Sequence, residues 1–437
     1  MSDALPLPPR PNLEQYKKLA KDLQRACKSD GPDAIRQWAT RWAETLARLQ
    51  GREQDTQREA ERLARQWAQM QKSQKDAARC TLTRAQFFLA RAHGFTCWPK
   101  FATHLEGLSQ ANSTAFHFEQ AADAIVTGDI ATLRTLIRTN PKLVAARSER
   151  EHRSTLLHYV SANGIEDFRQ KTPHNIIEIT KLLLDAGADV NAESDAYGGR
   201  STILGLTATS CHPEAAGVQL PLMELLIGQG ATLERADGGS AVVDCLRNGR
   251  KAASELLANR GGRLDLEAAA GVGRLDIVKS FFSEEGRLIR RATPEQMKDG
   301  FAWACEFGRT TVVDFLLQRG IALDLKLPHN GQTGLHWAAY GGHAETVRLL
   351  LERGAPVHAK DESFQGTPLE WALYQWGSSP YWAERGSYYE TVALLARAGA
   401  TLATEWLEQD DAERRHALRK LRADLRMQAA LRGELSP

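Results

Sequence analysis

A period of about 34 residues in the second half of the chain restricts its fold more than any other sequence feature. Four successive segments begin at Leu266, Phe301, Leu335 and Leu369, which are 35, 34 and 34 positions apart. Each segment starts with a short apolar stretch rich in alanine and continues with aliphatic residues at helical spacing. A helix pair of this size cannot bury its apolar faces alone, so the units must stack into an array.

The second half of each unit shows where its helix ends. Val347, Leu350 and Leu351 have the spacing of one helix face. A glycine follows this helix in several units, where a helix stop commonly needs a left-handed residue. These glycines are Gly187, Gly230, Gly320, Gly354 and Gly399. The pattern predicts an all-α solenoid of helix–turn–helix units.

Several of these segments resemble ankyrin repeats. The sequences GQTGLHWAA at 331–339, TLLH at 155–158 and TPLE at 367–370 are similar to the ankyrin signature. LLDAGADVNA at 183–192 resembles the end of the ankyrin second helix and the hairpin after it. The resemblance covers about residues 115–405, or about eight units. The resemblance implies a protein-binding array that contacts its partner through the hairpin tips and the faces of the first helices.

Two units depart from this pattern. The unit near 240–265 keeps only Ser-Ala-Val-Val-Asp-Cys at 240–245, and the first unit has no TPLH-like turn. A degenerate first unit is expected, because a terminal repeat presents a polar outer face. The weak central unit predicts a local irregularity in stacking.

The segments outside the array predict further helices. Residues 1–112 contain helix patterns at 13–27 and 33–78, and the block at 82–101 is similar to an N-terminal helical segment of many bacterial ankyrin-repeat proteins. We expect it to form a cap that buries Phe88, Phe95, Trp98 and Phe101. Residues 406–437 predict a charged final helix that shields the last repeat. The predicted domains are therefore 1–112, 113–405 and 406–437.

Composition gives little sign of other partners. The chain has 56 basic and 54 acidic side chains and a net charge of +2, which provides no long-range attraction to nucleic acid or acidic membranes. No apolar run at the N-terminus has signal-peptide length, so we expect a cytoplasmic protein. The six cysteines include no Cys-x-x-Cys pair, and we expect them to be reduced and buried.

No motif for catalysis, phosphate binding or a metal site is evident in the sequence. His158 and His336 recur at one repeat position, which indicates a structural hydrogen bond within the turn. His93 and Cys97 have metal-like spacing, but Gly94 interrupts the helix that would align them. We expect no cofactor, no metal and no small-molecule substrate.

Two kinds of segment are candidates for contact with a partner protein. Large side chains occupy hairpin tips where small polar residues would suffice, and aromatic residues lie in or beside an insertion. The predicted partner-binding residues are Tyr197, His329, Asn330, Phe364, Trp376, Tyr381 and Trp382. Insertions near 165–175, 210–220 and 376–388 separate the two helices of a unit, and the first two are a possible second patch.

The sequence thus favours a scaffold that binds a partner protein. Two alternatives remain open at this stage. A bacterial effector or a toxin-neutralising inhibitor would act by the same binding mode. An enzyme with its site in the N-terminal region is the third reading, although residues 1–112 show no polar cluster with catalytic character.

Overall fold

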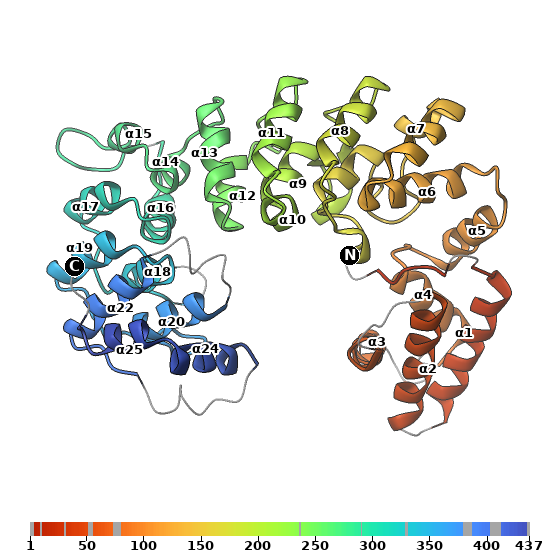
Figure 1. Cartoon of the computed structure of the whole chain (residues 1–437), viewed down its shortest axis with the longest axis horizontal. Helices are drawn as coiled ribbons and strands as arrows, with labels where there is room; N and C mark the ends of the chain where they lie inside the picture. Colours follow the sequence, from red (N-terminus) through yellow and green to blue (C-terminus); the bar gives the residue numbers. More distant parts are fainter. Residues whose placement is uncertain are drawn as a thin grey trace. The chain divides into compact units, whose positions relative to one another are not determined.

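The computed structural model describes residues 4–8, 11–29, 32–50, 56–72, 80–235, 237–289, 291–327, 331–378, 387–402 and 412–434. The chain divides into two compact units, Met1–Asp237 (unit 1) and Gly238–Pro437 (unit 2). Both units are built almost wholly of short helices joined by turns, as Figure 1 shows. The predicted all-α repeat fold is confirmed.

Unit 1 begins with five helices. Their bounds are α1 Leu13–Lys28, α2 Pro32–Gln50, α3 Thr56–Lys72, α4 Leu82–Ala92 and α5 Trp98–Leu108. Asn12 starts α1 by accepting a hydrogen bond from the Glu14 amide at 2.8 Å, and Thr81 caps α4 through the Arg84 amide at 3.3 Å.

Two apolar clusters hold these five helices together. One joins α1, α2, α3 and α4 and contains Trp38, Trp42, Trp67 and Phe88. The other lies where α1 and α4 meet α5, and it contains Phe95 and Phe101. Trp98, which we expected to be buried, is only partly covered.

A disulfide joins the end of α1 to the residue before the N-cap of α4. Cys27 and Cys80 are 53 positions apart, and their Cα atoms lie 5.6 Å from each other. The expectation of reduced cysteines is wrong for this pair, because α1 and α4 pack together and bring distant residues into contact. Cys245 and Cys305 are free and buried, whereas Cys211 is free and exposed.

The repeats of unit 1 follow α5. Their elements are α6 Thr114–Thr127, α7 Ile130–Thr139, η2 Pro141–Ala145, η3 Leu156–Ser161, η4 Asp167–Arg169, α8 Ile176–Asp185, β1 Glu193–Ser194, η5 Ala196–Gly198, β2 Ser201–Thr202, α9 Ile203–Thr209, α10 Cys211–Ala215 and α11 Gln219–Gly228. The repeat pairs are α6 with α7, η3 with α8, and α9 with α11. The short antiparallel strands β1 and β2 form one hairpin, with Glu193 opposite Thr202.

Unit 2 holds five further repeat pairs and two final helices. The pairs are α12 Ala241–Arg247 with α13 Lys251–Asn259, α14 Leu266–Val272 with α15 Leu275–Lys279, α16 Pro294–Glu306 with α17 Thr310–Gln318, α18 Gly334–Tyr340 with α19 Ala344–Glu352, and α20 Pro368–Ser378 with α22 Tyr388–Arg397. The final helices are α24 Ala412–Ala423 and α25 Leu425–Leu431. One apolar cluster runs through unit 2 from Leu266 to Ala430.

Local sequence accounts for the ends of the paired helices. Each glycine predicted to end a second helix has a positive φ, from 87° at Gly230 and Gly354 to 94° at Gly320 and Gly399. At the start of first helices, Thr155, Thr293 and Thr333 form capping boxes. The division between the units falls directly before α12, the unit in which the sequence predicts irregular stacking.

The described part of the C-terminal segment forms two helices where the sequence predicted one. Asp424 interrupts the pattern because its side chain accepts a hydrogen bond from the Met427 amide at 2.9 Å and starts α25. The same carboxylate accepts a hydrogen bond from Tyr389 on α22 at 2.8 Å. The final helices therefore pack against the last repeat pair, α24 on α20 and α25 on α22.

Candidate partner-binding surface

Three tryptophans occupy the same position in successive repeats of unit 2. Trp303 lies on α16, Trp337 on α18 and Trp371 on α20, each 34 residues from the next. The ring centroids of Trp303 and Trp337 are 6.3 Å apart, and those of Trp337 and Trp371 are 5.9 Å apart. Neighbouring first helices therefore carry a continuous series of aromatic rings.

Tyr340 and Phe364 extend this series at its α20 end. Their ring centroids lie 5.5 Å and 6.4 Å from that of Trp371. Trp337, Tyr340 and Trp371 are half-buried, whereas Phe364 is 59% exposed. We call Trp303, Trp337, Tyr340, Phe364 and Trp371 the aromatic row. Tryptophan and tyrosine on a rigid support are enriched at protein-binding hot spots.

Asp361 fixes the loop that presents Phe364. Its carboxylate accepts hydrogen bonds from the amides of Phe364 at 2.7 Å and Gly366 at 2.8 Å, and from the indole nitrogen of Trp371 at 3.0 Å. Burial alone would raise the pKa of Asp361, but these hydrogen bonds to the charged form outweigh it and lower the pKa. The carboxylate thus orders the loop and couples it to the row.

His336 joins the loop to the neighbouring repeat. Its Nδ1 accepts a hydrogen bond from the Thr333 amide at 3.0 Å, and its Nε2 donates to the Gly366 carbonyl at 3.1 Å. Burial lowers the pKa of His336 to about 4, so the ring is neutral at pH 7. His158 accepts from the Thr155 amide in the same way, at 3.1 Å. The predicted structural role of both histidines is confirmed.

Glu306 is a half-buried acid beside the aromatic row. Its Oε2 is enclosed and has no hydrogen-bond partner among the described residues. Burial raises the pKa of Glu306 to about 8, so the carboxyl group is largely protonated at pH 7. Burial, together with this carboxyl group, also raises the pKa of Tyr340 to about 12. This acid is a feature that the sequence pattern does not reveal, because nothing in its spacing shows its burial.

The predicted partner-binding residues belong to different parts of the chain. Tyr197 is 67% exposed at a hairpin of unit 1, where its hydroxyl donates to Asn163 Oδ1 at 2.6 Å. Phe364 belongs to unit 2 and joins the aromatic row. Four other predicted residues lie outside the described part of the chain. They are His329, Asn330, Tyr381 and Trp382.

Trp376 requires a correction, because it is 1% exposed and belongs to the core of unit 2. The ammonium group of Lys420 lies 4.3 Å from its ring centroid and donates a hydrogen bond to its carbonyl at 2.7 Å. The final helices therefore cover this side chain, and it is not available to a partner. Sequence analysis missed this because the covering residues are more than forty positions away in the chain.

The insertion near 165–175 also differs from the exposed patch that we considered. Glu166 and Arg169 are buried. Arg169 pairs with Glu119 at 2.8 Å and with Asp123 at 2.7 Å, and Glu166 pairs with Arg150 at 2.9 Å. The insertion is thus fastened to α6 and to the preceding hairpin by an enclosed ion-pair network. The buried charges of the insertion are paired with opposite charges of neighbouring elements, so the segment has a structural role.

The insertion near 210–220 is likewise tied to its own repeat. The amide nitrogen of the buried Gln219 side chain donates to the carbonyls of Thr207 and Ser210, both at 3.0 Å.

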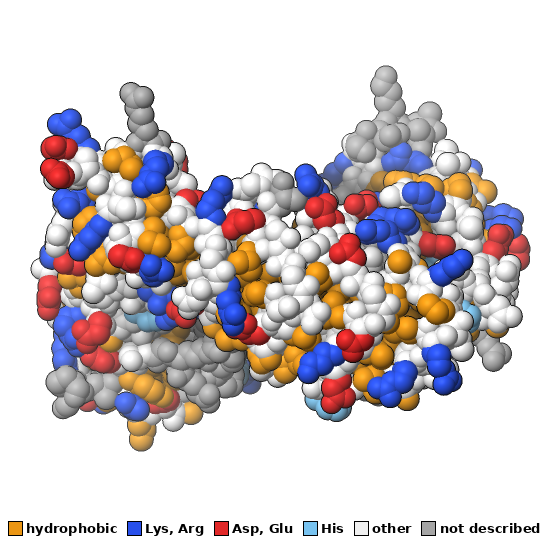
Figure 2. Space-filling model, turned by 90° about the horizontal axis from the view of Figure 1, so that it is seen from above, with side chains coloured by type: hydrophobic (Ala, Val, Ile, Leu, Met, Phe, Trp, Pro, Cys, Tyr) orange, Lys and Arg blue, Asp and Glu red, His pale blue; other side chains and the backbone are white. Residues whose placement is uncertain are grey.

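On the face seen in Figure 2, lysine and arginine are interspersed with aspartate and glutamate. That face shows no broad field of one sign within either unit.

The findings on metal binding and on membrane crossing apply to the described residues. His93 donates from Nδ1 to the Leu5 carbonyl at 2.9 Å, and burial lowers its pKa to about 3. Within the described ranges, no group of three His, Cys, Asp or Glu side chains could hold a metal ion. No described helix is long and apolar enough to cross a bilayer.

Residues 301–404, which include the whole aromatic row, match the family model described as ankyrin repeats (3 copies). This segment of the chain is therefore similar to ankyrin repeats. Among solved structures, a crystal structure of the human ASB11 ankyrin repeat domain is 20% identical to it. That match covers 65% of this chain and 99% of that one, with a TM-score of 0.32. No curated protein matches the sequence.

Ankyrin repeats are generally protein–protein interaction modules. The three copies matched by the family model span α16 to α22, so their first helices carry the three tryptophans. The 34-residue repeat places the three tryptophans at the same position of successive first helices. This makes the aromatic row the strongest candidate for contact with a partner.

Proposed function

We propose that this ankyrin-repeat chain binds a partner protein through the aromatic row and the loop 361–366. The main support for this proposal is that Phe364 is 59% exposed while the enclosed carboxylate of Asp361 holds its backbone in place. A large apolar side chain on an ordered loop loses little conformational entropy on binding. It therefore offers more net affinity than the same residue on an unstructured segment.

The repeat scaffold supports the same proposal. Trp303 and Trp371 each use their indole nitrogen in an internal hydrogen bond, to Glu267 at 3.0 Å and to Asp361 at 3.0 Å. Their ring orientations are thus fixed before a partner arrives. Such preorganised aromatic rings favour binding over catalysis as the role of this surface.

The test is a comparison of three full-length proteins as baits in an extract of the source cells. The wild type is compared with Phe364→Glu, which places a charge at the exposed end of the aromatic row. The matched control is Leu425→Glu, because Leu425 is 77% exposed on α25 of the same unit. Captured proteins are identified by mass spectrometry, and affinities are then measured with the purified partner.

We expect a protein that the wild type and Leu425→Glu capture equally and that Phe364→Glu loses. The affinity for that protein should fall by about tenfold or more in Phe364→Glu, as for the loss of one hot-spot residue. Equal capture by all three baits would place the binding surface elsewhere. Tyr197→Glu then tests the hairpin of unit 1, the other exposed aromatic site that the sequence predicted.

The domain division remains part of the proposal. We propose that residues 1–112 cap the first repeat, supported by a 2.8 Å hydrogen bond from the Glu151 amide to the Gly94 carbonyl. An ion pair between Arg91 and Glu151 at 2.6 Å lies beside it. Residues 406–437 cap the other end in the same proposal. Limited proteolysis of the full-length protein checks this division, because it should release neither segment before the repeats are cleaved.

A cytoplasmic location also remains a prediction. The disulfide between Cys27 and Cys80 is a feature more common in oxidising compartments. Alkylation of the protein in intact source cells, followed by mass spectrometry, reports whether this pair is oxidised there. A fully reduced pair supports the cytoplasmic prediction, and a fully oxidised pair contradicts it.

A further inference from the structure

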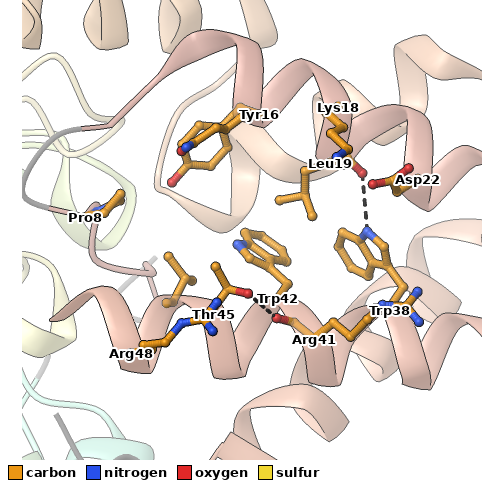
Figure 3. A pocket seen from close by; sticks show the side chains of 12 residues that line it. Pro8, Tyr16, Lys18, Leu19, Asp22, Trp38, Arg41, Trp42, Thr45 and Arg48 are labelled. Atoms are coloured by element: carbon orange, nitrogen blue, oxygen red, sulfur yellow. Dashed lines mark hydrogen bonds between the residues drawn. The ribbon is translucent and has the colours of Figure 1, made fainter. Parts of the chain in front are cut away.

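A pocket of about 470 Å³ lies between α1 and α2, in the part of unit 1 that precedes the repeats. Figure 3 shows its lining residues on the two facing helices. They are Pro8, Gln15, Tyr16, Lys18, Leu19, Asp22, Trp38, Arg41, Trp42, Thr45, Leu46 and Arg48. The pocket is separate from the aromatic row and has no part in the function proposed above.

The apolar lining of the pocket is held rigidly. The rings of Trp38 and Trp42 are 5.1 Å apart, and the indole nitrogen of Trp38 donates to the Leu19 carbonyl at 3.3 Å. That hydrogen bond, drawn as a dashed line in Figure 3, ties α2 to α1. Tyr16 makes edge-on ring contacts with His93 and Phe101, with 5.2 Å and 5.1 Å between the ring centroids. The aromatic lining therefore exists before any ligand binds.

Tyr16 has an unused hydrogen-bonding group in this pocket. The residue is 4% exposed, and its hydroxyl group has no partner among the described residues. Figure 3 shows this hydroxyl directed from α1 toward α2. The hydroxyl oxygen is itself enclosed, so we do not count it among the contacts of a ligand in the pocket.

The rim of the pocket is positively charged. Lys18, Arg41 and Arg48 are exposed, and none of them forms an ion pair within the described residues. The one acidic lining residue, Asp22, is already paired with Arg25 at 2.6 Å. An approaching carboxylate would therefore meet three available cations.

The spacing of these cations indicates how long the ligand is. Arg41 and Arg48 are seven residues apart on α2, which corresponds to about 10 Å along the helix. The two arginines therefore start two helical turns apart and can pair with different acidic side chains of one ligand. A peptide with two or more acidic side chains can span them while an apolar side chain packs against Trp38 and Trp42.

We propose that this pocket binds a short acidic peptide segment of another protein, with an apolar side chain against the tryptophans. Acidic side chains of the segment pair with Arg41 and Arg48. The chain thus has a second recognition site, outside its repeats, for partners with acidic linear motifs.

The test uses the full-length protein and two synthetic peptide arrays. One array combines Glu or Asp with Phe or Leu at varied spacing, and the other has Lys in place of every acid. The peptides that bind best are remade with a fluorescent label, and their affinities are measured by anisotropy. Three variants are compared with the wild type: Arg41→Glu with Arg48→Glu, Tyr16→Phe, and the control Arg36→Glu.

Arg36 is the matched control because it is an exposed arginine on α2 that does not line the pocket. We expect the wild type and Arg36→Glu to bind acidic peptides equally and to ignore the Lys array. The double variant should bind at least about tenfold more weakly, whereas Tyr16→Phe should bind as the wild type does, because the Tyr16 hydroxyl is enclosed. Affinity should also fall as salt concentration rises.

Equal binding to both arrays, or unchanged affinity in the double variant, would overturn the proposal. Two further probes distinguish other anionic occupants. If phenylpropionate alone binds as tightly as the best peptide, the site takes small carboxylates and not peptides. If phosphatidylserine vesicles bind through Arg41 and Arg48 while no peptide does, the site is a membrane contact. Either result rejects the peptide assignment.

Discussion

The indole nitrogen of Trp371 donates a hydrogen bond to the carboxylate of Asp361, with 3.0 Å between the two atoms. This contact joins the first helix of one repeat to the loop that precedes it, and it lies directly behind Phe364. The surface that we propose for partner binding therefore depends on one enclosed carboxylate.

Replacing Asp361 should loosen this loop without unfolding the repeats. Asp361→Ala removes acceptors for three backbone amides and one indole, so we expect a stability loss of about 1–3 kcal/mol. Hydrogen exchange should accelerate at residues 361–366, and capture of the partner should weaken. Asp314→Ala is a suitable control, since Asp314 lies on α17 and outside this loop. Unchanged exchange in the loop would show that the carboxylate does not hold it.

Glu306 should make unit 2 less stable as pH rises. Its pKa is about 8 in the folded chain and 4.5 in the reference state. The folded state therefore binds the extra proton, and its contribution to stability is full below pH 4.5 and is lost as pH rises through 8. Glu306→Gln keeps the shape and removes the titration.

The measurement is the free energy of unfolding of wild type and Glu306→Gln at pH 6 and pH 8.5. The wild type should lose stability relative to the variant by on the order of 1–3 kcal/mol between these values. Comparing the two proteins cancels the titration of other groups. A constant difference between them would contradict the raised pKa of Glu306.

The buried ion pairs of unit 1 should stabilise the folded state less in acid. Burial alone would raise the pKa of Glu119, but Arg150 and Arg169 outweigh it and lower the pKa to about 2 from 4.5. The stability contributed by Glu119 is thus present above pH 4.5 and is lost as pH falls toward 2. Arg169→Ala leaves buried carboxylates without one partner, so it should cost about 3–5 kcal/mol at pH 7.

Thermal unfolding at pH 7 and pH 3 tests this network. The wild type should lose more stability between the two values than Arg169→Ala, because the variant has already lost the pairing that acid would remove. An exposed arginine such as Arg274, which pairs only with Asp276 at 2.7 Å, gives a control substitution. Equal acid sensitivity of wild type and Arg169→Ala would argue against the network.

Reduction of the disulfide should weaken the N-terminal helices. Cys27 and Cys80 enclose α2 and α3, so opening the bond increases the conformational entropy of the unfolded segment between them. We expect a loss of about 2–4 kcal/mol for opening this segment. Hydrogen exchange of α2 and α3 should accelerate after reduction, while exchange in α18 and α19 stays constant. Acceleration in both places would indicate a general effect of the reductant.

The sequence predicted the repeat array well because its signals are local. The glycines after second helices and the threonines before first helices each act within a few residues. His336 could be assigned to a turn for the same reason, since its Thr333 contact is three positions away. Such features recur in several units, so one pattern predicts many elements.

The features that sequence analysis missed depend on contacts between distant residues. Trp376 looked like part of an aromatic loop, but Lys420 and α24 cover it. Cys27 meets Cys80 only after α1 and α4 have packed. Arg41 and Arg48 looked like ordinary surface charges until the pocket beside Tyr16 was visible. In each case the partner lies on another helix, and spacing along the chain does not show it.

Hydrogen exchange of the full-length chain, alone and with its captured partner, tests the central claim most directly. We expect the partner to slow exchange in loop 361–366 and in the first helices α16, α18 and α20. The same partner should leave exchange unchanged in Phe364→Glu. Protection confined to α1 and α2, or to the hairpin around Tyr197, would contradict binding through the aromatic row.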